Sequence, residues 1–297
     1  MLKRTLHFGN PFHISTSLNQ MKLTNKATGE ERTLPVEDLG FVVFEHPQIT
    51  FTQGIMRLLA ENKVAVVFCD EKYHPSSVLL HLDGNLLQTK RFRSQLDASE
   101  PLKKKLWQQT IEQKLRNQAL LLDANGRDGE AVLYKSKQVK SGDTTNEEAK
   151  GASVYWNRLF GRDFNRERFG EAPNALLNYG YAILRAATAR ALSGSGLHPT
   201  LGIHHQNQFN SFCLADDIME PYRPYVDQLV LDFLEENEMV NELDKNIKAH
   251  LLGVLSMDVM INGKRSPLMV ALSHTTASLA DCFAGEKRKL KFPEFAS

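Results

Sequence analysis

The stretch LKKKLWQQTIEQKLRNQALLL, residues 102–122, places its apolar residues at helical spacing. These apolar residues are Leu106, Trp107, Ile111, Leu115, Leu120 and Leu121. The segment 123–129, with two glycines and an Asn-Gly pair, ends the pattern. Further helical stretches are predicted at residues 130–140, 147–160, 172–192, 211–237, 243–261 and 267–284. From about residue 90 onward we therefore expect an all-α domain, interrupted by a polar loop over residues 193–210.

The first 80 or so residues have the short β-branched and aromatic runs that are typical of strands. Residues 41–44 and 64–68 are continuous apolar runs, as expected for buried strands, and residues 5–8 and 18–23 are also predicted strands. A short helix is predicted between the two apolar runs, over residues 53–62. The fold class is therefore α+β, with a small β-rich, sandwich-like domain over residues 1–82 and an all-α domain over residues 90–297.

Composition limits the possible functions of this 297-residue chain, of which 42% is hydrophobic and 24% charged. Its three cysteines are scattered and argue against both a disulfide framework and a zinc knuckle. No signal peptide or membrane-length apolar run is visible, so a cytoplasmic protein is expected. The net charge of +1 means that any nucleic-acid binding must rest on local basic patches. Such a run of eight basic residues is Lys90, Arg91, Arg93, Lys103, Lys104, Lys105, Lys114 and Arg116, although runs of this kind are usually solvated helix faces.

Acidic and imidazole side chains of the helical domain form the candidate site. Asp217 and Glu220 are three residues apart, which places both carboxylates on one helix face. Glu148 opens another predicted helix, and His205 lies in the polar loop just before the Asp/Glu helix. Carboxylates with an imidazole suit a divalent metal that polarises a phosphate, and this mixture of ligands favours Mg²⁺ or Mn²⁺. Phosphate-binding, zinc-protease and nucleophile-elbow motifs are absent from the sequence.

Each member of this candidate site also has a structural alternative. Glu148 completes a capping box that begins at Thr145. Asp217 lies near a helix start, where acidic residues are favoured by the helix dipole. Glu220 precedes a proline and could face solvent at a kink, and a histidine in a loop, such as His205, is more often a surface residue than a ligand. Spacing alone leaves these alternatives open.

Four further stretches follow one another along the chain, Glu148–Trp156, Asn178–Arg185, Gly196–His205 and Asn207–Pro224. Together they resemble the CRISPR spacer-acquisition endonuclease family, the first-numbered Cas protein, most closely its branch from type II systems. The resemblance implies that the metal ligands are Glu148, His205 and Glu220. Glu148 is the matching glutamate because it precedes a Tyr-aromatic pair by seven residues, and His205 is the matching histidine because it ends the Gly-x-x-His loop. It also implies that Asp217 supports catalysis. Ala149 departs from the glycine that many relatives have there, which concerns helix packing only.

The same resemblance implies an activity and partners. The activity is metal-dependent cleavage of DNA and integration of short fragments into a repeat array, in which a 3′-hydroxyl attacks a phosphodiester. The implied partners are double-stranded DNA, a second copy of the chain and the small second-numbered Cas protein, with contacts through the N-terminal domain. Arg223 is a candidate phosphate contact or a partner in an internal salt bridge, and Lys103, Lys104 and Lys105 are candidate DNA contacts. Two other functions remain open, a non-catalytic helical DNA-binding scaffold and a metal phosphohydrolase that acts on nucleotides.

Overall fold

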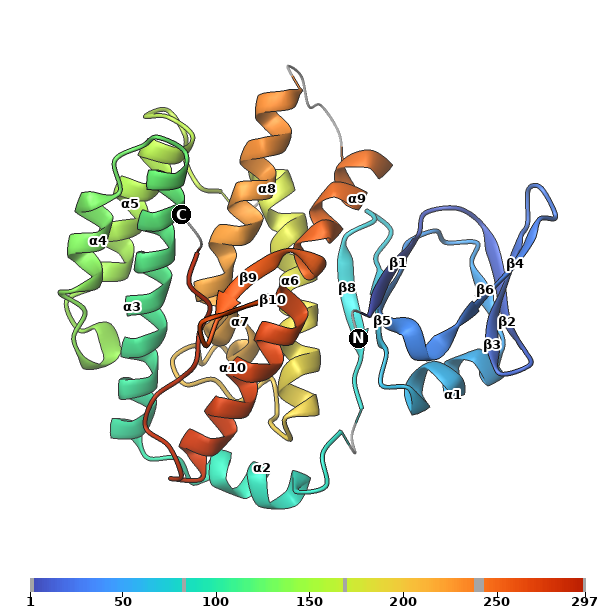
Figure 1. Ribbon diagram of the computed structural model, residues 1–297, viewed down its shortest axis with the longest axis horizontal. Coiled ribbons are helices and arrows are strands. Elements are labelled where there is room, and N and C mark those ends of the chain that lie inside the picture. The colour runs from blue at the N-terminus through green and yellow to red at the C-terminus, as the bar shows by residue number, and fades with distance from the viewer. Residues whose placement is uncertain (1–2, 82–83, 168–169, 238–242, 296–297) are drawn as a thin grey trace. The chain divides into compact units, whose positions relative to one another are not determined.

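A computed structural model describes residues 3–81, 84–167, 170–237 and 243–295. The chain divides into two compact units, Met1–Gly84 and Asn85–Ser297. The linker predicted around residues 80–90 includes residues 82 and 83, which lie outside the described residues. The expected fold class is confirmed, because a β-rich unit precedes a larger helical one (Figure 1).

The described residues of the N-terminal unit form two four-stranded sheets, one α-helix and a short 3-10 turn (Figure 1). The first sheet has the order β1-β5-β7-β8, in which only β8 runs antiparallel to its neighbour, and the second has the order β4-β3-β2-β6. The elements are β1 (Arg4–Phe8), β2 (Phe12–Ser17), β3 (Gln20–Asn25), β4 (Glu31–Pro35), β5 (Leu39–Phe44), β6 (Thr50–Phe51), α1 (Gln53–Glu61), β7 (Ala65–Cys69) and β8 (Pro75–Leu79).

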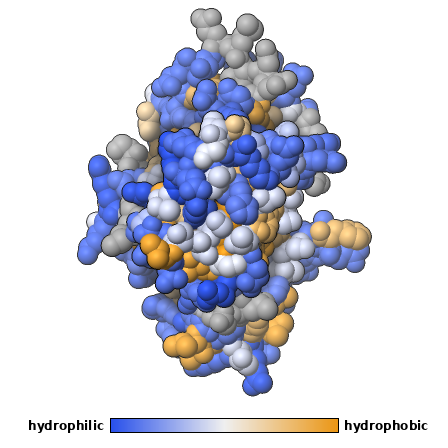
Figure 2. Space-filling model, turned by 90° about the vertical axis from the view of Figure 1, so that its right-hand side faces the viewer, coloured by the Kyte–Doolittle hydropathy of each residue, from blue (hydrophilic) through white to orange (hydrophobic). Residues whose placement is uncertain are grey.

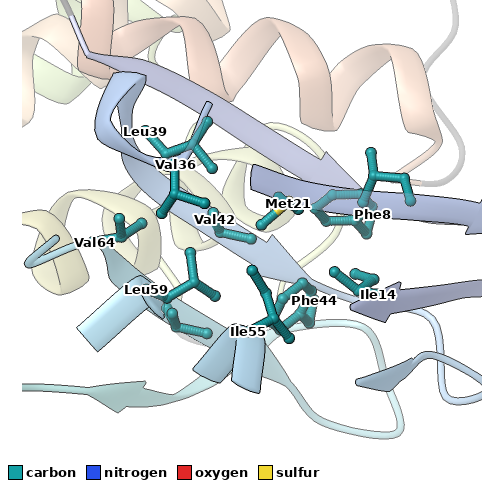
Figure 3. Packing of buried hydrophobic residues seen from close by; sticks show 12 residues of the cluster. Phe8, Ile14, Met21, Val36, Leu39, Val42, Phe44, Ile55, Leu59 and Val64 are labelled. Carbon is teal, nitrogen blue, oxygen red and sulfur yellow. The ribbon is translucent and has the colours of Figure 1, made fainter. Parts of the chain in front are cut away.

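Apolar side chains from both sheets and from α1 meet in one core, which Figure 3 shows from close by. The central strand β5 is buried at every residue, which explains its unbroken apolar sequence. Strand β3 instead alternates, with Met21 and Leu23 buried and Lys22 between them only partly covered.

On the face shown in Figure 2, hydrophobic residues lie in patches among hydrophilic ones. The expected role of the N-terminal domain in dimer or partner contacts stays a prediction.

The strand predicted at residues 18–23 is wrong at its start. Leu18 and Asn19 both have positive φ, 49° and 58°, and they form the two-residue turn between β2 and β3. Two left-handed residues give the turn whose twist matches the flanking strands. Because Leu18 is not a residue that commonly adopts this conformation, the turn had no clear sequence signal.

The helical unit contains nine described α-helices and one short hairpin (Figure 1). They are α2 (Gln88–Leu96), α3 (Glu100–Ala124), α4 (Glu130–Ser136), α5 (Glu147–Leu159), α6 (Asn174–Gly194), α7 (Cys213–Met219), α8 (Arg223–Glu236), α9 (Lys245–Leu252), β9 (Asp258–Ile261), β10 (Lys264–Pro267) and α10 (Leu268–Phe283). None of these described helices is both long and apolar enough to cross a membrane.

Two predicted helices differ from the structure. The helix predicted at 211–237 is two helices, because Pro221 and Pro224 lie at the starts of a 3-10 turn (Glu220–Tyr222) and of α8. The helix predicted at 243–261 stops at Leu252, and its last residues form β9 of a hairpin. The turn of this hairpin is Asn262-Gly263, with φ of 53° and 72°, so a strong hairpin signal was present in the sequence.

Candidate active site

Glu148 lies in the first turn of α5, and its position is fixed by Asp143. The Asp143 carboxylate accepts hydrogen bonds from the backbone N–H groups of Glu147 (2.9 Å) and Glu148 (3.0 Å). The capping-box alternative is therefore wrong, because Asp143 does the capping and the Thr145 hydroxyl has no hydrogen-bond partner among the described residues. The side chain of Glu148 is left to make other contacts.

Lys114, in the middle of α3, connects Glu148 to Glu220. Its ammonium nitrogen lies 2.6 Å from Glu148 Oε1, as a hydrogen bond, and 2.7 Å from Glu220 Oε2. Glu220 is only 4% exposed, so the expectation that it could face solvent at a kink is wrong. Its other oxygen, Oε1, lies 2.9 Å from Arg223 Nε, one helical turn later. Neither contact to Glu220 has hydrogen-bond geometry, so both are ion pairs.

Opposite charges at this site stabilise the ionised forms of Glu220 and Lys114. Burial alone would raise the pKa of the Glu220 carboxyl, but the positive charges of Arg223 and Lys114 outweigh it and the pKa is lowered. Burial would likewise lower the pKa of Lys114, and the negative charges of Glu220 and Glu148 raise it instead. The site is therefore a mutually compensated set of two carboxylates and two cations, in which Lys114 and Glu220 are buried and Glu148 and Arg223 are partly buried.

Asp217 holds the loop that carries His205. It is fully buried, and its Oδ2 accepts backbone hydrogen bonds from Ile203 (2.7 Å) and His204 (3.0 Å). Its Oδ1 accepts the backbone N–H of His205 (3.2 Å) and lies 2.6 Å from His205 Nδ1. This hydrogen bond raises the pKa of His205 and fixes the ring so that Nε2 is the nitrogen available to a ligand. Asp217 is thus a positioning residue.

Trp107 supports the same loop from α3. Its buried indole stacks on the His204 ring, with centroids 4.1 Å apart and planes 2° apart, and meets His205 edge to face at 5.8 Å. Trp107 and Lys114 are seven residues apart, two helical turns, so they lie on one face of α3. One helix face therefore organises both the carboxylates and the histidine loop.

The predicted site residues are brought together only in part. Among the residues that the structure describes, no group of three His, Cys, Asp or Glu side chains is arranged to hold a metal ion. Glu148 and Glu220 nevertheless converge on one cationic nitrogen, which shows that a cation fits between their oxygens. Carboxylate oxygens suit Mg²⁺ and Mn²⁺, and the imidazole of His205 would suit Mn²⁺. The two carboxylates and the imidazole therefore suit such a metal chemically. The loop that carries His205 is held in place by contacts separate from those of Glu148 and Glu220.

Two further polar groups around the site were missed by sequence reasoning. Arg185 of α6 forms a bidentate pair with Asp216, at 2.6 and 3.2 Å. In α8, the fully buried Asp227 accepts hydrogen bonds from Tyr155 (2.6 Å) and Tyr181 (2.5 Å). The tyrosines and Arg185 belong to the four stretches that carried the resemblance, so these stretches include the framework of the site as well as its expected ligands.

Comparison with known proteins assigns the family. The family described as CRISPR associated protein Cas1 matches residues 8–256. A CRISPR-associated endonuclease Cas1 of Neisseria meningitidis is 37% identical over 281 residues, which cover 94% of this chain and 92% of the relative. The chain belongs to the Cas1 family.

Solved structures share the Cas1 fold. A casposase bound to its integration product superposes with a TM-score of 0.79 at 21% identity, covering 99% of this chain and 93% of the other. A Cas1 protein from Thermotoga maritima gives 0.74 at 14% identity, covering 99% of both chains. At these identities the likeness concerns the fold, and it extends over both units of the chain.

The residues expected to contact DNA lie in different surroundings, Arg223 in an internal ion pair and Lys103 at the edge of a cavity. Arg223 pairs with Glu220 and its guanidinium lies over the Tyr181 ring, 4.5 Å from the centroid, so the salt-bridge alternative describes its contacts. Lys103 pairs with Glu100 at 3.1 Å and, with His205, lines a cavity of about 330 Å³. The polar loop residues Gln206, Asn207, Gln208 and Asn210 also line this cavity. DNA contact by Lys103, Lys104, Lys105 and Arg223 stays a prediction.

Gly202 allows the His205 loop to fold back onto Asp217. A Cβ at this position would lie 2.3 Å from the His205 carbonyl oxygen and 2.9 Å from Asp217 Oδ2. We expect Gly202→Ala to lower the free energy of unfolding by about 1–3 kcal/mol, because backbone must shift. Gly194→Ala is the matched control, since a Cβ there meets nothing within 4 Å and alanine favours the helix. Urea denaturation of both variants tests this, and equal stabilities would contradict it.

Asp227 gives a pH-dependent prediction. Burial raises its pKa to about 6 from 3.8, against the opposing hydrogen bonds of Tyr155 and Tyr181. The folded chain therefore holds this proton more tightly than the unfolded chain, so the contribution of Asp227 to stability is present below about pH 4 and is lost as the pH rises through about 6. We expect the stability of wild type relative to Asp227→Asn to fall by up to about 3 kcal/mol between these pH values. Urea denaturation across this range measures it, and a constant difference would refute the assignment.

Proposed function

We propose that this protein is a metal-dependent DNA endonuclease and integrase of CRISPR adaptation, which joins short foreign DNA fragments to a repeat array. The observation that carries the proposal is the convergence of Glu148 and Glu220 on one cation, next to a histidine that is held for coordination by a buried aspartate. Membership of the Cas1 family and the name of the Neisseria meningitidis relative, an endonuclease, support it.

In this proposal Glu148, Glu220 and His205 hold Mg²⁺ or Mn²⁺. The bound ion would polarise the scissile phosphate and stabilise the charge that develops on its oxygens. Asp217 keeps Nδ1 of His205 engaged, so that Nε2 is presented in one orientation. Arg223 remains on Glu220 Oε1 and directs the other oxygen, Oε2, toward the metal position. In strand transfer a DNA 3′-hydroxyl would attack the phosphorus, so that a new P–O bond forms, the scissile P–O bond breaks and the displaced oxygen leaves as a hydroxyl of the cut strand. Water in place of the 3′-hydroxyl would give cleavage.

The proposed partners are DNA, a second copy of the chain and the small second-numbered Cas protein. Support comes from the names of structures with this fold, among them a Cas6-RT-Cas1–Cas2 complex (TM-score 0.73, 19% identity, covering 97% of this chain and 35% of that one). The casposase structure contains an integration product. The cavity beside His205, lined by Lys103 and by side-chain amides, offers polar groups to a nucleic-acid strand.

A non-catalytic DNA-binding scaffold is the second candidate, and one observation favours it. The charges of Glu148 and Glu220 are compensated within the protein, which is also what a purely structural ion-pair network requires. The two functions differ in their need for metal. A scaffold would bind DNA equally well with a chelator and would join no strands.

Substitution of the proposed ligands separates the two functions. We expect Glu148→Gln, His205→Ala and Glu220→Gln each to reduce fragment integration into a supercoiled repeat plasmid by at least about 100-fold, because each removes a donor to the ion that stabilises the transition state. The assay contains the full chain, its small partner and Mn²⁺.

The chain offers matched controls for this assay. Glu147 is the neighbouring acid, and it pairs with Lys150 and Lys135 on another face of α5. His204 is the neighbouring imidazole and stacks on Trp107. Glu147→Gln and His204→Phe are expected to keep integration within a few-fold of wild type. Integration by His205→Ala at the wild-type rate would rule out its assignment as a ligand.

A further inference from the structure

Lys114 occupies the place where two of the proposed metal ligands meet. Its nitrogen lies 2.6 Å from Glu148 Oε1 and 2.7 Å from Glu220 Oε2, and the residue is only 8% exposed. The ammonium is therefore buried in contact with both carboxylates at once. A metal ion that bridges Glu148 Oε1 and Glu220 Oε2 would use the same two oxygens.

A divalent metal and this ammonium cannot occupy the position together. Mg²⁺ binds carboxylate oxygens at roughly 2.0–2.1 Å, so an ion held by both oxygens would lie almost where the Lys114 nitrogen now lies. The two species are also both positively charged, and their repulsion is strong in a buried site. Metal binding between Glu148 and Glu220 therefore requires Lys114 to leave.

We propose that Lys114 is a built-in counterion of the metal-free enzyme. It holds Glu148 and Glu220 together until a divalent cation displaces it, and it competes with that cation for both carboxylates. The proposal rests on the proposed metal site. It makes Lys114 a positioning residue.

The surroundings of Lys114 favour displacement of the ammonium over displacement of Arg223. The guanidinium of Arg223 contacts the opposite oxygen of Glu220, Oε1, and is also held over the Tyr181 ring. Lys114 has a flexible four-carbon stem whose end can move while its Cα stays fixed in α3. The pair Glu220–Arg223 can thus persist in the metal-bound state while Oε2 exchanges ammonium for metal.

Binding of Mn²⁺ to purified full-length protein, measured by electron paramagnetic resonance, tests the competition. We expect Lys114→Met to bind Mn²⁺ at least about tenfold more tightly than wild type, because the competing cation is gone. In chelator the same variant should unfold at a lower temperature, since Glu148 and the buried Glu220 each lose their ion pair with Lys114. The rise in its unfolding temperature on adding Mn²⁺ should exceed that of wild type. Lys248→Met is the control, because Lys248 is also a buried lysine but lies on α9, 5.9 Å from the Tyr179 ring centroid.

Affinity of Lys114→Met equal to or below that of wild type would overturn the proposal. If none of the three proteins, wild type, Lys114→Met and Lys248→Met, binds Mn²⁺, the proposed metal site is wrong. The proposal for Lys114 is then wrong as well. Binding that disappears in Glu148→Gln and Glu220→Gln locates the ion at this site.

A second measurement needs no substitution and so does not depend on folding of the variant. Wild-type protein is treated with an amine-acylating reagent with and without Mn²⁺, and the modification of Lys114 is read by peptide mass spectrometry. We expect several-fold more modification of Lys114 with Mn²⁺, because the displaced ammonium leaves its buried ion pairs, and unchanged modification of Lys248. Unchanged modification of Lys114 at saturating Mn²⁺ would overturn the proposal.

Discussion

Four charged groups meet where α3, α5, the turn after α7 and the start of α8 come together, and their mutual compensation constrains the rest of the helical unit. Lys114 and Glu220 are buried, and Glu148 and Arg223 are partly buried. Glu148 and Glu220 share Lys114, and Glu220 also pairs with Arg223. Removing either buried member, Lys114 or Glu220, leaves the other with less compensation, and breaking a buried ion pair in this way costs about 3–5 kcal/mol. The helices that carry these residues must therefore keep their register, and the structure supplies tight contacts to hold it. A Cβ on Gly151 of α5, for example, would lie 2.3 Å from a methyl carbon of Leu115 on α3.

The histidine side of the site is held by a different set of contacts. Asp217 accepts three backbone N–H groups of the loop and engages His205 Nδ1, while Trp107 stacks on His204. None of these contacts involves Glu148 or Lys114. The site thus consists of two separately fixed halves, and both halves touch the same face of α3. A metal bound by all three proposed ligands would be the connection between them.

Sequence patterns predicted those parts of the fold in which the apolar residues follow a clear pattern. The helix α3 was found because its apolar residues recur at helical spacing, and the strands β5 and β7 were found because their apolar runs are continuous. The turn at Leu18-Asn19 was not found, because its left-handed backbone is imposed by strand pairing and not by a residue that prefers it. The hairpin at Asn262-Gly263 was missed for another reason, since its signal was present but was read as the end of a helix.

The candidate site, too, could be predicted only in part from the sequence. Spacing singled out Glu148, His205 and Glu220 as candidates but left a capping role or solvent exposure open for the acids. Capping by the nearby Asp143 decided against the first, and the burial of Glu220 decided against the second. Lys114 was grouped with a surface basic run, although its spacing from Trp107 and Ile111 places it on the buried face of α3. A cation on an apolar helix face requires a buried anion, so this spacing could have indicated that two acids meet there.

The burial of Lys114 also bears on how a chain with a net charge of +1 attracts DNA. One of the eight basic residues of its basic run is neutralised inside the protein and adds nothing to the surface field. In the metal-free site the two carboxylates are balanced by Lys114 and Arg223, so there is little local attraction for a phosphate. In the proposed function, a divalent cation that replaces the ammonium would leave an excess of positive charge at the position proposed for the scissile phosphate. Metal loading would then create the affinity for phosphate as well as the chemistry, and this coupling does not need a strongly basic protein.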